Sequence, residues 1–320
     1  MPTRWILRSL LMLALATFVR PSVAQANPED AQKSPAFRLN VPVDEVSLTF
    51  HAADAHGLPI NDLQLSELRL LDNGKPPRKV LDFRVQQDFP IRVGILMDTS
   101  ESMEKTRAGD RAIAIKYVQR LLRQKTDQAF VVNFGVLSKM SQPWTNDPVA
   151  LADGIRNRVL STNGSGHFAG TAVFDAIYRA CLGQFGHIDN AASGNFILLF
   201  SDGEDNASRA PLKLSVDTCQ HSNTAVYVFR PRSTSSLATG PESLMELTTQ
   251  TGGRIFLDAD TDDEIDNDLR LIEANLRNQY RLIYKPAELK RDGSFHRIEL
   301  KAPDRVDSIN IRSGYYAPTH

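Results

Sequence analysis

Carboxyl and hydroxyl side chains follow a run of apolar residues in the first half of the 320-residue chain. Asp98, Ser100 and Ser102 stand at alternate positions directly after the apolar run 91–97. They offer only oxygen ligands, which suit a hard cation such as Mg²⁺ better than Zn²⁺. The apolar run is typical of a strand buried on both faces, and open parallel sheets bind ligands at the carboxyl ends of such strands. The pattern therefore predicts a cation site at the end of this strand.

Two further segments can complete the shell of this cation, because Mg²⁺ requires six oxygens in a nearly octahedral arrangement. Thr171 follows a glycine-rich loop and stands at the start of a predicted helix, and Asp202 comes directly after the apolar run 195–200. In a doubly wound sheet the strand 195–200 lies beside the strand 91–97, where the strand order reverses. We therefore expect five metal ligands: Asp98, Ser100, Ser102, Thr171 and Asp202.

Simpler explanations exist for single residues of this set and for their neighbours. Acids and serines before a helix can satisfy its free N–H groups, which would account for Asp98 but not for three separate segments. We expect Asp175 to pair within its own helix, and residues 204–206 to form a solvated acidic loop, with a second Ca²⁺ there as the alternative. His167 is expected to be a loop residue that borders the metal site.

Strands and helices alternate from residue 91 to residue 278, which predicts an α/β fold with a doubly wound parallel sheet. The helices between the strands show apolar spacings of three and four, and one of them opens with Asp147 as its cap and Pro148 in its first turn. The last helix is predicted over 262–279. The predicted strands are 91–97, 129–134, 135–140, 195–200, 225–229 and 254–257.

Short strands flank this α/β domain on both sides, over residues 38–88 and 279–320. Two hairpins are predicted, around Asn73-Gly74 and around Asp292-Gly293, because these residues accept the positive φ of tight turns. A single strand is predicted over 309–315. Neither set has enough strands to be stable alone. We therefore expect both sets to form one small β-sandwich-like module, with the α/β domain 91–278 inserted between them.

The N-terminus has the pattern of a secretory signal peptide over residues 1–26. Arg4 and Arg8 precede the apolar core 10–19, and the small residues Ala24 and Ala26 follow it. An uncleaved anchor is the alternative, although the apolar core is short for a bilayer. After a flexible leader over 27–37, the mature protein is expected to lack a membrane span and to be periplasmic or secreted.

The chain has two cysteines, Cys181 and Cys219. Export makes a disulfide between them chemically possible. Each cysteine, however, lies on the apolar face of a predicted helix, which favours two buried free thiols.

Composition and motifs argue against nucleic-acid binding and against catalysis. With a formal net charge of -1 the chain has no basic field that would attract nucleic acid. No G-x-S-x-G nucleophile elbow occurs. The glycines around Ser165 do not follow the first strand of the α/β domain, which excludes a dinucleotide-binding turn, and the histidines lack zinc spacing. A hydrolase that uses Ser165 and His167 is the weaker alternative.

The three polar segments, taken in order, resemble the metal-ion-dependent adhesion site of von Willebrand factor A domains. The segments are Asp98-Thr99-Ser100-Glu101-Ser102, Gly170-Thr171 and Ser201-Asp202-Gly203. The flanks resemble exported bacterial VWFA-related domain proteins, on the segments Asp72-Asn73-Gly74-Lys75, Thr251-Gly252-Gly253-Arg254, Leu276-Arg277-Asn278-Gln279-Tyr280 and Ser313-Gly314-Tyr315-Tyr316. The chain departs from the family at Glu101, where a small residue is common; we expect this side chain to face solvent.

The resemblance implies that Ser100, Ser102 and Thr171 bind the cation through their hydroxyls. Asp98 and Asp202 would bind it directly or through water. The cation would be Mg²⁺, with Mn²⁺ or Ca²⁺ as alternatives, and one position would accept an Asp or Glu carboxylate from a protein partner. The expected function is therefore metal-dependent, adhesion-type protein binding without catalysis. The alternative is a periplasmic scaffold domain in which the metal only stabilises the fold.

Overall fold

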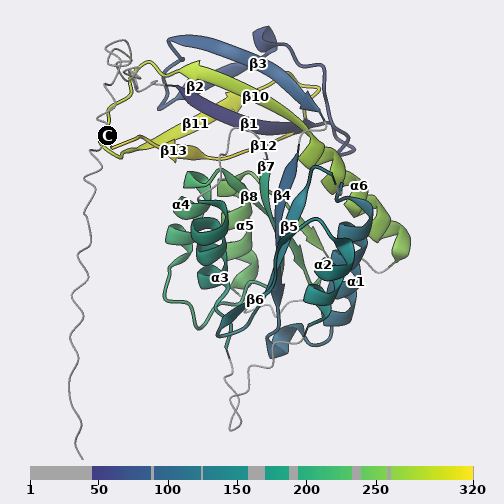
Figure 1. Ribbon diagram of the computed structural model, residues 1–320. Coiled ribbons are helices and arrows are strands. Elements are labelled where there is room, and N and C mark those ends of the chain that lie inside the picture. The colour runs from purple at the N-terminus through teal and green to yellow at the C-terminus, as the bar shows by residue number, and fades with distance from the viewer. Residues whose placement is uncertain are drawn as a thin grey trace, which may run out of the picture. The chain divides into compact units, whose positions relative to one another are not determined.

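A computed structural model describes residues 45–87, 90–123, 125–157, 170–186, 194–232, 239–257 and 261–319. All of these residues belong to one compact unit, Asp44–His320 (Figure 1). The predicted signal peptide and leader, as well as Ser165 and His167, lie outside the described residues. Within the described part, no helix combines the length and the apolar character needed to cross a membrane.

The central sheet has six strands in the order β6-β5-β4-β7-β8-β9. All neighbours in it run parallel except β5 and β6, which are antiparallel. Every residue of β7 is buried, because helices cover both faces of the sheet. The predicted doubly wound α/β fold is confirmed. The strands are β4 (Ile91–Asp98), β5 (Gln128–Phe134), β6 (Ser138–Thr145), β7 (Gly194–Phe200), β8 (Thr224–Arg230) and β9 (Ile255–Leu257).

Three helices pack on each face of this sheet (Figure 1). Successive residues of β4 point to opposite faces, so Ile95 and Met97 join one apolar cluster and Leu96 joins the other. Asp147 caps its helix as predicted, because its side chain accepts a hydrogen bond from the Val149 N–H at 2.9 Å. One face carries α1 (Arg107–Arg120), α2 (Pro148–Arg156) and α6 (Asp262–Arg277); the other carries α3 (Val173–Ala180), α4 (Leu212–His221) and α5 (Gly240–Thr251).

Two antiparallel sheets form the β-sandwich module, and each combines strands from both flanks of the chain. The four-stranded sheet has the order β12-β1-β10-β3, and the three-stranded sheet has the order β13-β11-β2. Phe50, Tyr280 and Ile298 belong to the apolar cluster between them. The expected joint module is confirmed. Its strands are β1 (Val46–Ala53), β2 (Arg69–Asp72), β3 (Lys79–Gln87), β10 (Asn278–Lys285), β11 (Phe295–Lys301), β12 (Ser308–Ile311) and β13 (Gly314–Tyr316).

The two predicted hairpins are wrong in their strand pairing, although both turns form. Asn73, Gly74 and Gly293 adopt positive φ values of 48°, 74° and 72°. However, β2 pairs with β11 whereas β3 pairs with β10, so each turn carries the chain from one sheet to the other. After the first turn, Pro76 and Pro77 lack the N–H groups that a hairpin ladder needs, so β3 cannot continue beside β2.

The predicted strand 309–315 is wrong in the same way, because it consists of β12 and β13 in different sheets. Between them, the Ser313 N–H donates to the carbonyl oxygen of Gln250 at the end of α5. This contact directs the Ser313 N–H away from both sheets, whereas its carbonyl still accepts from the Ile298 N–H of β11. It also attaches the sandwich to the α/β domain.

A buried carboxylate links the two sheets of the sandwich. Asp72 accepts hydrogen bonds from the hydroxyls of Tyr284 and Tyr315, both at 2.7 Å, and its other oxygen lies 2.6 Å from His296 Nδ1. Tyr284 belongs to the four-stranded sheet, whereas Asp72, Tyr315 and His296 belong to the three-stranded sheet. The cluster therefore specifies how the two sheets face one another.

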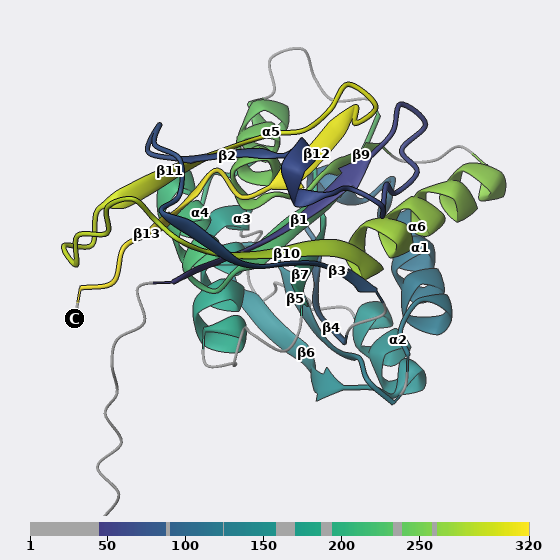
Figure 2. The same cartoon turned by 90° about the horizontal axis from the view of Figure 1, so that it is seen from above.

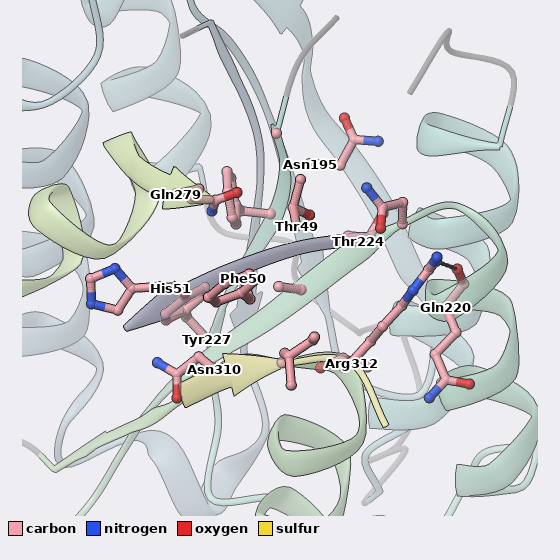
Figure 3. A pocket seen from close by; sticks show the side chains of 17 residues that line it. Thr49, Phe50, His51, Asn195, Gln220, Thr224, Tyr227, Gln279, Asn310 and Arg312 are labelled. Carbon is pink, nitrogen blue, oxygen red and sulfur yellow. Dashed lines mark hydrogen bonds between the residues drawn. The ribbon is translucent and has the colours of Figure 1, made fainter. Parts of the chain in front are cut away.

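The sandwich meets the amino ends of the central strands through a polar joint. Figure 2 shows that α6 runs directly into β10, the helix ending at Arg277 and the strand beginning at Asn278. The Arg312 guanidinium donates to the carbonyls of Gln220 and Ser47. A cavity of about 40 Å³ lies beside it (Figure 3), with room for a few water molecules. Its buried polar lining includes His51, Asn195, Gln220, Thr224 and Gln279.

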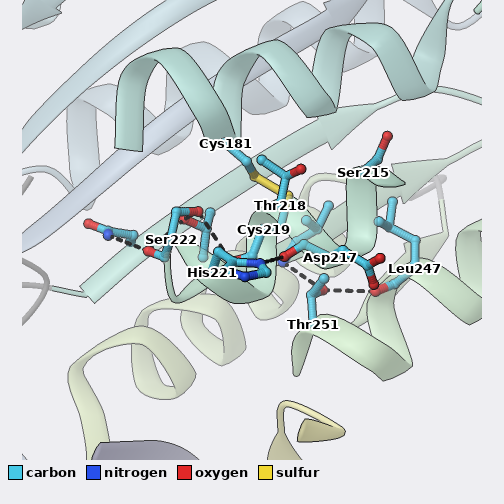
Figure 4. The surroundings of a disulfide bond; sticks show 12 residues. Cys181, Ser215, Asp217, Thr218, Cys219, His221, Ser222, Leu247 and Thr251 are labelled. Carbon is cyan, nitrogen blue, oxygen red and sulfur yellow. Dashed lines mark hydrogen bonds between the residues drawn. A yellow bond between two sulfur atoms is a disulfide. The ribbon is translucent and has the colours of Figure 1, made fainter. Parts of the chain in front are cut away.

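Cys181 and Cys219 form a disulfide, so the predicted free thiols are wrong. The bond connects the π-helical turn that follows α3 with α4 (Figure 4). Both cysteines are fully buried in the apolar cluster on that face, as the sequence indicated. The sequence could not show that the two apolar helix faces meet.

We expect the Cys181→Ala, Cys219→Ala double variant to lose about 4 kcal/mol of unfolding free energy, because the bond closes a 38-residue separation in the unfolded chain. Urea unfolding with and without a thiol reductant measures this loss. The reductant should destabilise the wild type and leave the double variant unchanged. Equal stability of both proteins without reductant would contradict the expectation.

Candidate metal centre

The ends of β4 and β7 bring the two candidate acids together at the carboxyl edge of the central sheet. β4 and β7 pair in parallel, with Met97 opposite Phe200, so Asp98 and Asp202 follow neighbouring strand ends. Both are buried, with exposed fractions of 3% and 7%. The predicted placement of these strands at the point where strand order reverses is confirmed.

Hydrogen bonds to both oxygens hold the Asp98 carboxylate in place. One oxygen accepts from the Ser100 N–H at 2.8 Å, and the other accepts from the Ser201 hydroxyl at 2.7 Å. The Ser201 oxygen in turn accepts from the Gly203 N–H at 3.1 Å. The spacing of the candidate ligands in the sequence indicated no role for Ser201. Its signal was a hydroxyl residue at the end of a buried strand, directly before the second acid.

Burial raises the pKa of the Asp98 carboxyl to about 6, although the hydrogen bonds from Ser100 and Ser201 oppose this shift. The neighbouring charge of Asp202 raises this pKa further. Among the described residues, neither acid forms an ion pair with a lysine or an arginine. Two buried carboxylates without a basic partner are unfavourable, and a bound dication would relieve the repulsion between them.

Ser100 and Ser102 present their hydroxyl oxygens 3.1 Å apart. The 3₁₀ turn η3 (Glu101–Met103) begins directly after Ser100 and contains Ser102; its last residue, Met103, is buried. Glu101 is exposed, as expected. The alternative that Asp98 caps a helix is wrong, since α1 begins only at Arg107 and Asp98 bonds the Ser100 N–H instead.

Thr171 is attached to the loop that follows β7. Its N–H donates to the Asn206 side-chain oxygen at 2.8 Å, and its carbonyl accepts from the N–H groups of Asn206 and Ala207. Gly170 precedes it with a φ of +154°, and a Cβ there would lie 2.9 Å from the same Asn206 oxygen. These hydrogen bonds join Thr171, which is buried, to the loop that contains Asp202 and Asn206. Two of the three ligand-bearing segments are therefore in direct contact.

The loop over 204–206 is only partly solvated as expected, because Glu204 and Asp205 are half-buried and cap neighbouring helices, whereas Asn206 is exposed. The Asp205 carboxylate accepts from the Phe174 N–H at 2.9 Å, at the start of α3. Glu204 accepts from the Gly240 N–H at the start of α5. The first N–H groups of a helix lack intrahelical partners, and acids satisfy them well.

Asp175 pairs within its own helix as expected, at 3.6 Å from Arg179. It also accepts from the N–H groups of Arg209 and Ala210. These contacts fix the loop after β7 from a second side. The carboxylates of Asp175, Glu204 and Asp205 therefore each accept hydrogen bonds from backbone N–H groups.

The chemistry of the five candidate ligands fits a hard cation. Over the described residues, no group of three or more His, Cys, Asp or Glu side chains could hold a metal. A metal at this edge must therefore rely on hydroxyl oxygens as well as on the two acids, which suits Mg²⁺. Asp98, Ser100 and Ser102 lie together at the end of β4. The loop of Asp202 is hydrogen-bonded to Asp98 through Ser201, and it is hydrogen-bonded to Thr171 as well.

No family model and no curated protein matches the chain, whereas several solved structures match part of it. Proximal thread matrix protein 1 from the mussel byssus is 16% identical over 59% of this chain and 48% of its own, with a TM-score of 0.46. BatB from Bacteroides thetaiotaomicron is 15% identical over 57% of this chain and 97% of its own, with a TM-score of 0.45. The chain thus spans about half the length of the mussel protein.

One structure of the mussel protein is described as having a zinc-occupied metal-ion-dependent adhesion site. These neighbours are of the von Willebrand factor A type. The doubly wound sheet and its strand order are observed in this chain itself.

The metal-free protein should lose stability as the pH rises from about 4 to 6. Burial raises the pKa of Asp98 from 3.8 to about 6, so in this window the folded state holds a proton that the unfolded chain has released. The free energy of unfolding then falls with rising pH, by about 3 kcal/mol in total, and the whole cost is present above about pH 6. Urea unfolding of chelator-treated protein across this range measures the slope.

The variant Asp98→Asn should lack this part of the slope, because it cannot ionise. Asp153→Asn, which changes an exposed acid on α2, is the matched control and should keep the wild-type slope. A stability difference between wild type and Asp98→Asn that stays constant with pH would contradict the expected pKa shift.

Proposed function

We propose that the protein is an exported, non-enzymatic binding protein that holds a divalent cation at the carboxyl edge of its central sheet. In this proposal Asp98, Ser100, Ser102, Thr171 and Asp202 would hold the cation so that one of its positions is open to an Asp or Glu carboxylate of a protein partner. The observation that carries this proposal is the pair of buried acids, Asp98 and Asp202, on loops that also present the hydroxyls of Ser100, Ser102 and Thr171. Hydrogen bonds within the chain hold these loops in place, which supports a site that is arranged by the protein itself.

In the proposed mechanism the three hydroxyls and the two acids hold the cation, with Mg²⁺ favoured and Mn²⁺ or Ca²⁺ as alternatives. When bound, the cation supplies an electrophilic position that accepts one oxygen of the partner's carboxylate. Two carboxylates balance the charge of a dication without exceeding it, so an acidic ligand remains attractive. A pre-formed site lowers the ordering cost of binding.

Two features support export to the periplasm or beyond. The first is the predicted signal peptide over residues 1–26. The second is the Cys181–Cys219 disulfide, because such bonds persist in oxidising compartments and are rare in the cytosol. In this proposal the mature protein has no membrane span and does not bind nucleic acid.

The proposed absence of catalysis is supported by the state of Ser201, the buried hydroxyl that contacts Asp98. Ser201 is fully buried and donates its proton to Asp98 while accepting from Gly203. A serine nucleophile needs access to substrate and an adjacent general base. Ser201 instead holds the Asp98 carboxylate in place by a hydrogen bond.

Asp98→Asn should abolish both cation binding and partner capture. Titration calorimetry with MgCl₂ should show affinity reduced by about 100-fold or more, because even changes outside the first shell of a metal cost about 10-fold to 100-fold. A pull-down with the mature protein should require Mg²⁺ and should be prevented by a chelator. Asp153→Asn, which changes an exposed side chain of α2, should behave as the wild type.

The same variants separate binding from the scaffold alternative. Loss of partner capture without a lowered melting temperature supports the binding proposal. A lowered melting temperature with partner capture retained supports a scaffold whose metal only stabilises the fold. Partner binding that ignores the chelator would remove the proposed mechanism.

A further inference from the structure

A positively charged side chain at the start of α1 reaches back to the loop that carries three of the candidate ligands. The Arg107 guanidinium donates from one nitrogen to the carbonyl oxygens of Thr99, at 3.1 Å, and Ser100, at 2.7 Å. These two carbonyls lie in the turn that connects Asp98 to Ser102. The ligand spacing in the sequence gave no indication of Arg107.

Three sets of hydrogen bonds hold this turn. The Thr99 N–H and hydroxyl both donate to the Phe134 carbonyl at the end of β5, at 2.7 and 2.8 Å. The Ser100 N–H donates to Asp98. Arg107 binds the carbonyl oxygens of the same two residues. Hydrogen bonds from an ionised donor are about twice as strong as those between neutral groups, so this contact is a strong restraint on the turn.

The placement of Arg107 is not explained by an ion pair. Its side chain is partly buried, and its Nε is buried without a hydrogen-bond partner among the described residues. Partial burial of a guanidinium without a carboxylate partner is unfavourable. The two carbonyls of the turn are the partners that the structure provides for it. Its contacts thus serve the conformation of the turn.

We propose that Arg107 is a positioning residue of the candidate metal centre. It keeps the loop 98–102 in the conformation that presents Ser100 and Ser102 before a cation arrives. This inference rests on the proposed function where it concerns cation binding. It adds that the affinity of the site depends on a residue that does not itself contact the metal.

Electrostatics alone predicts the opposite effect of removing Arg107. A positive charge beside a cation site repels the cation, so its loss would strengthen binding if charge were its main contribution. Loss of positioning would instead weaken binding, because the loop would have to be ordered when the cation binds. The sign of the change in affinity therefore decides between the two roles.

The test compares Arg107→Gln and Arg107→Lys with Arg120→Gln in the mature protein. Arg120 lies on the same helix and, within the described part of the chain, forms an exposed ion pair with Asp266, so its loss changes the charge equally without touching the loop. Titration calorimetry with MgCl₂ should show affinity about 10-fold to 100-fold weaker for Arg107→Gln. Arg107→Lys, which keeps a charged donor, should restore part of the loss, and Arg120→Gln should bind as the wild type.

Amide hydrogen exchange of residues 99–102 in chelator-treated protein gives a readout that does not involve a metal. Arg107→Gln should accelerate exchange there, whereas Arg120→Gln should not. Unchanged or tighter Mg²⁺ binding by Arg107→Gln overturns the inference, as does unchanged exchange. If Arg107→Gln does not fold, wild-type affinity and exchange in Arg107→Lys overturn it. Absence of Mg²⁺ binding by the wild type overturns the proposed function instead, and the exchange comparison still tests the loop.

Discussion

The buried carboxylate of Asp98 is the constraint on which the arrangement at the carboxyl edge depends. A buried carboxylate is costly unless hydrogen bonds satisfy it, and the chain satisfies this one with neutral donors. One donor is the Ser100 N–H, which bends the loop after β4, and the other is the Ser201 hydroxyl, which joins that loop to the end of β7. Among the residues that the structure describes, neither donor is a lysine or an arginine, so the same hydrogen bonds that order the loops leave the charge of the carboxylate unbalanced there.

The sandwich uses a buried carboxylate in a comparable way at another place. Asp72 accepts hydrogen bonds from tyrosine hydroxyls of both sheets and thereby specifies how the two sheets face one another. The direct passage from α6 into β10 and the Arg312 contacts join the sandwich to the amino ends of the central strands. The candidate site lies at the opposite, carboxyl ends. The structure therefore separates the attachment of the two parts from the surface proposed to bind a partner.

Local patterns in the sequence predicted the central fold well, because its strands are buried on both faces and its helices are amphipathic. The run 91–97 could only be a buried strand, and Asp147-Pro148 specified a helix start. The same local reasoning failed where strands change partners. The turn at Asn73-Gly74 formed as predicted, but the pairing of β2 and β3 with distant strands is decided by packing between the sheets. The disulfide was missed because its formation depends on which helix faces meet.

By itself, the sequence determined the alternation of elements, the order of the three polar segments and the five candidate ligands. These follow from residue type and spacing, which set strand burial and place oxygen side chains at strand ends. Only the tertiary structure decided that Ser201 bonds Asp98, that Asn206 bonds Thr171 and that Arg107 reaches Thr99 and Ser100. Each of these contacts except that of Arg107 joins residues far apart in the chain. Even Arg107 depends on how α1 turns back over the loop, and no local pattern encodes that direction.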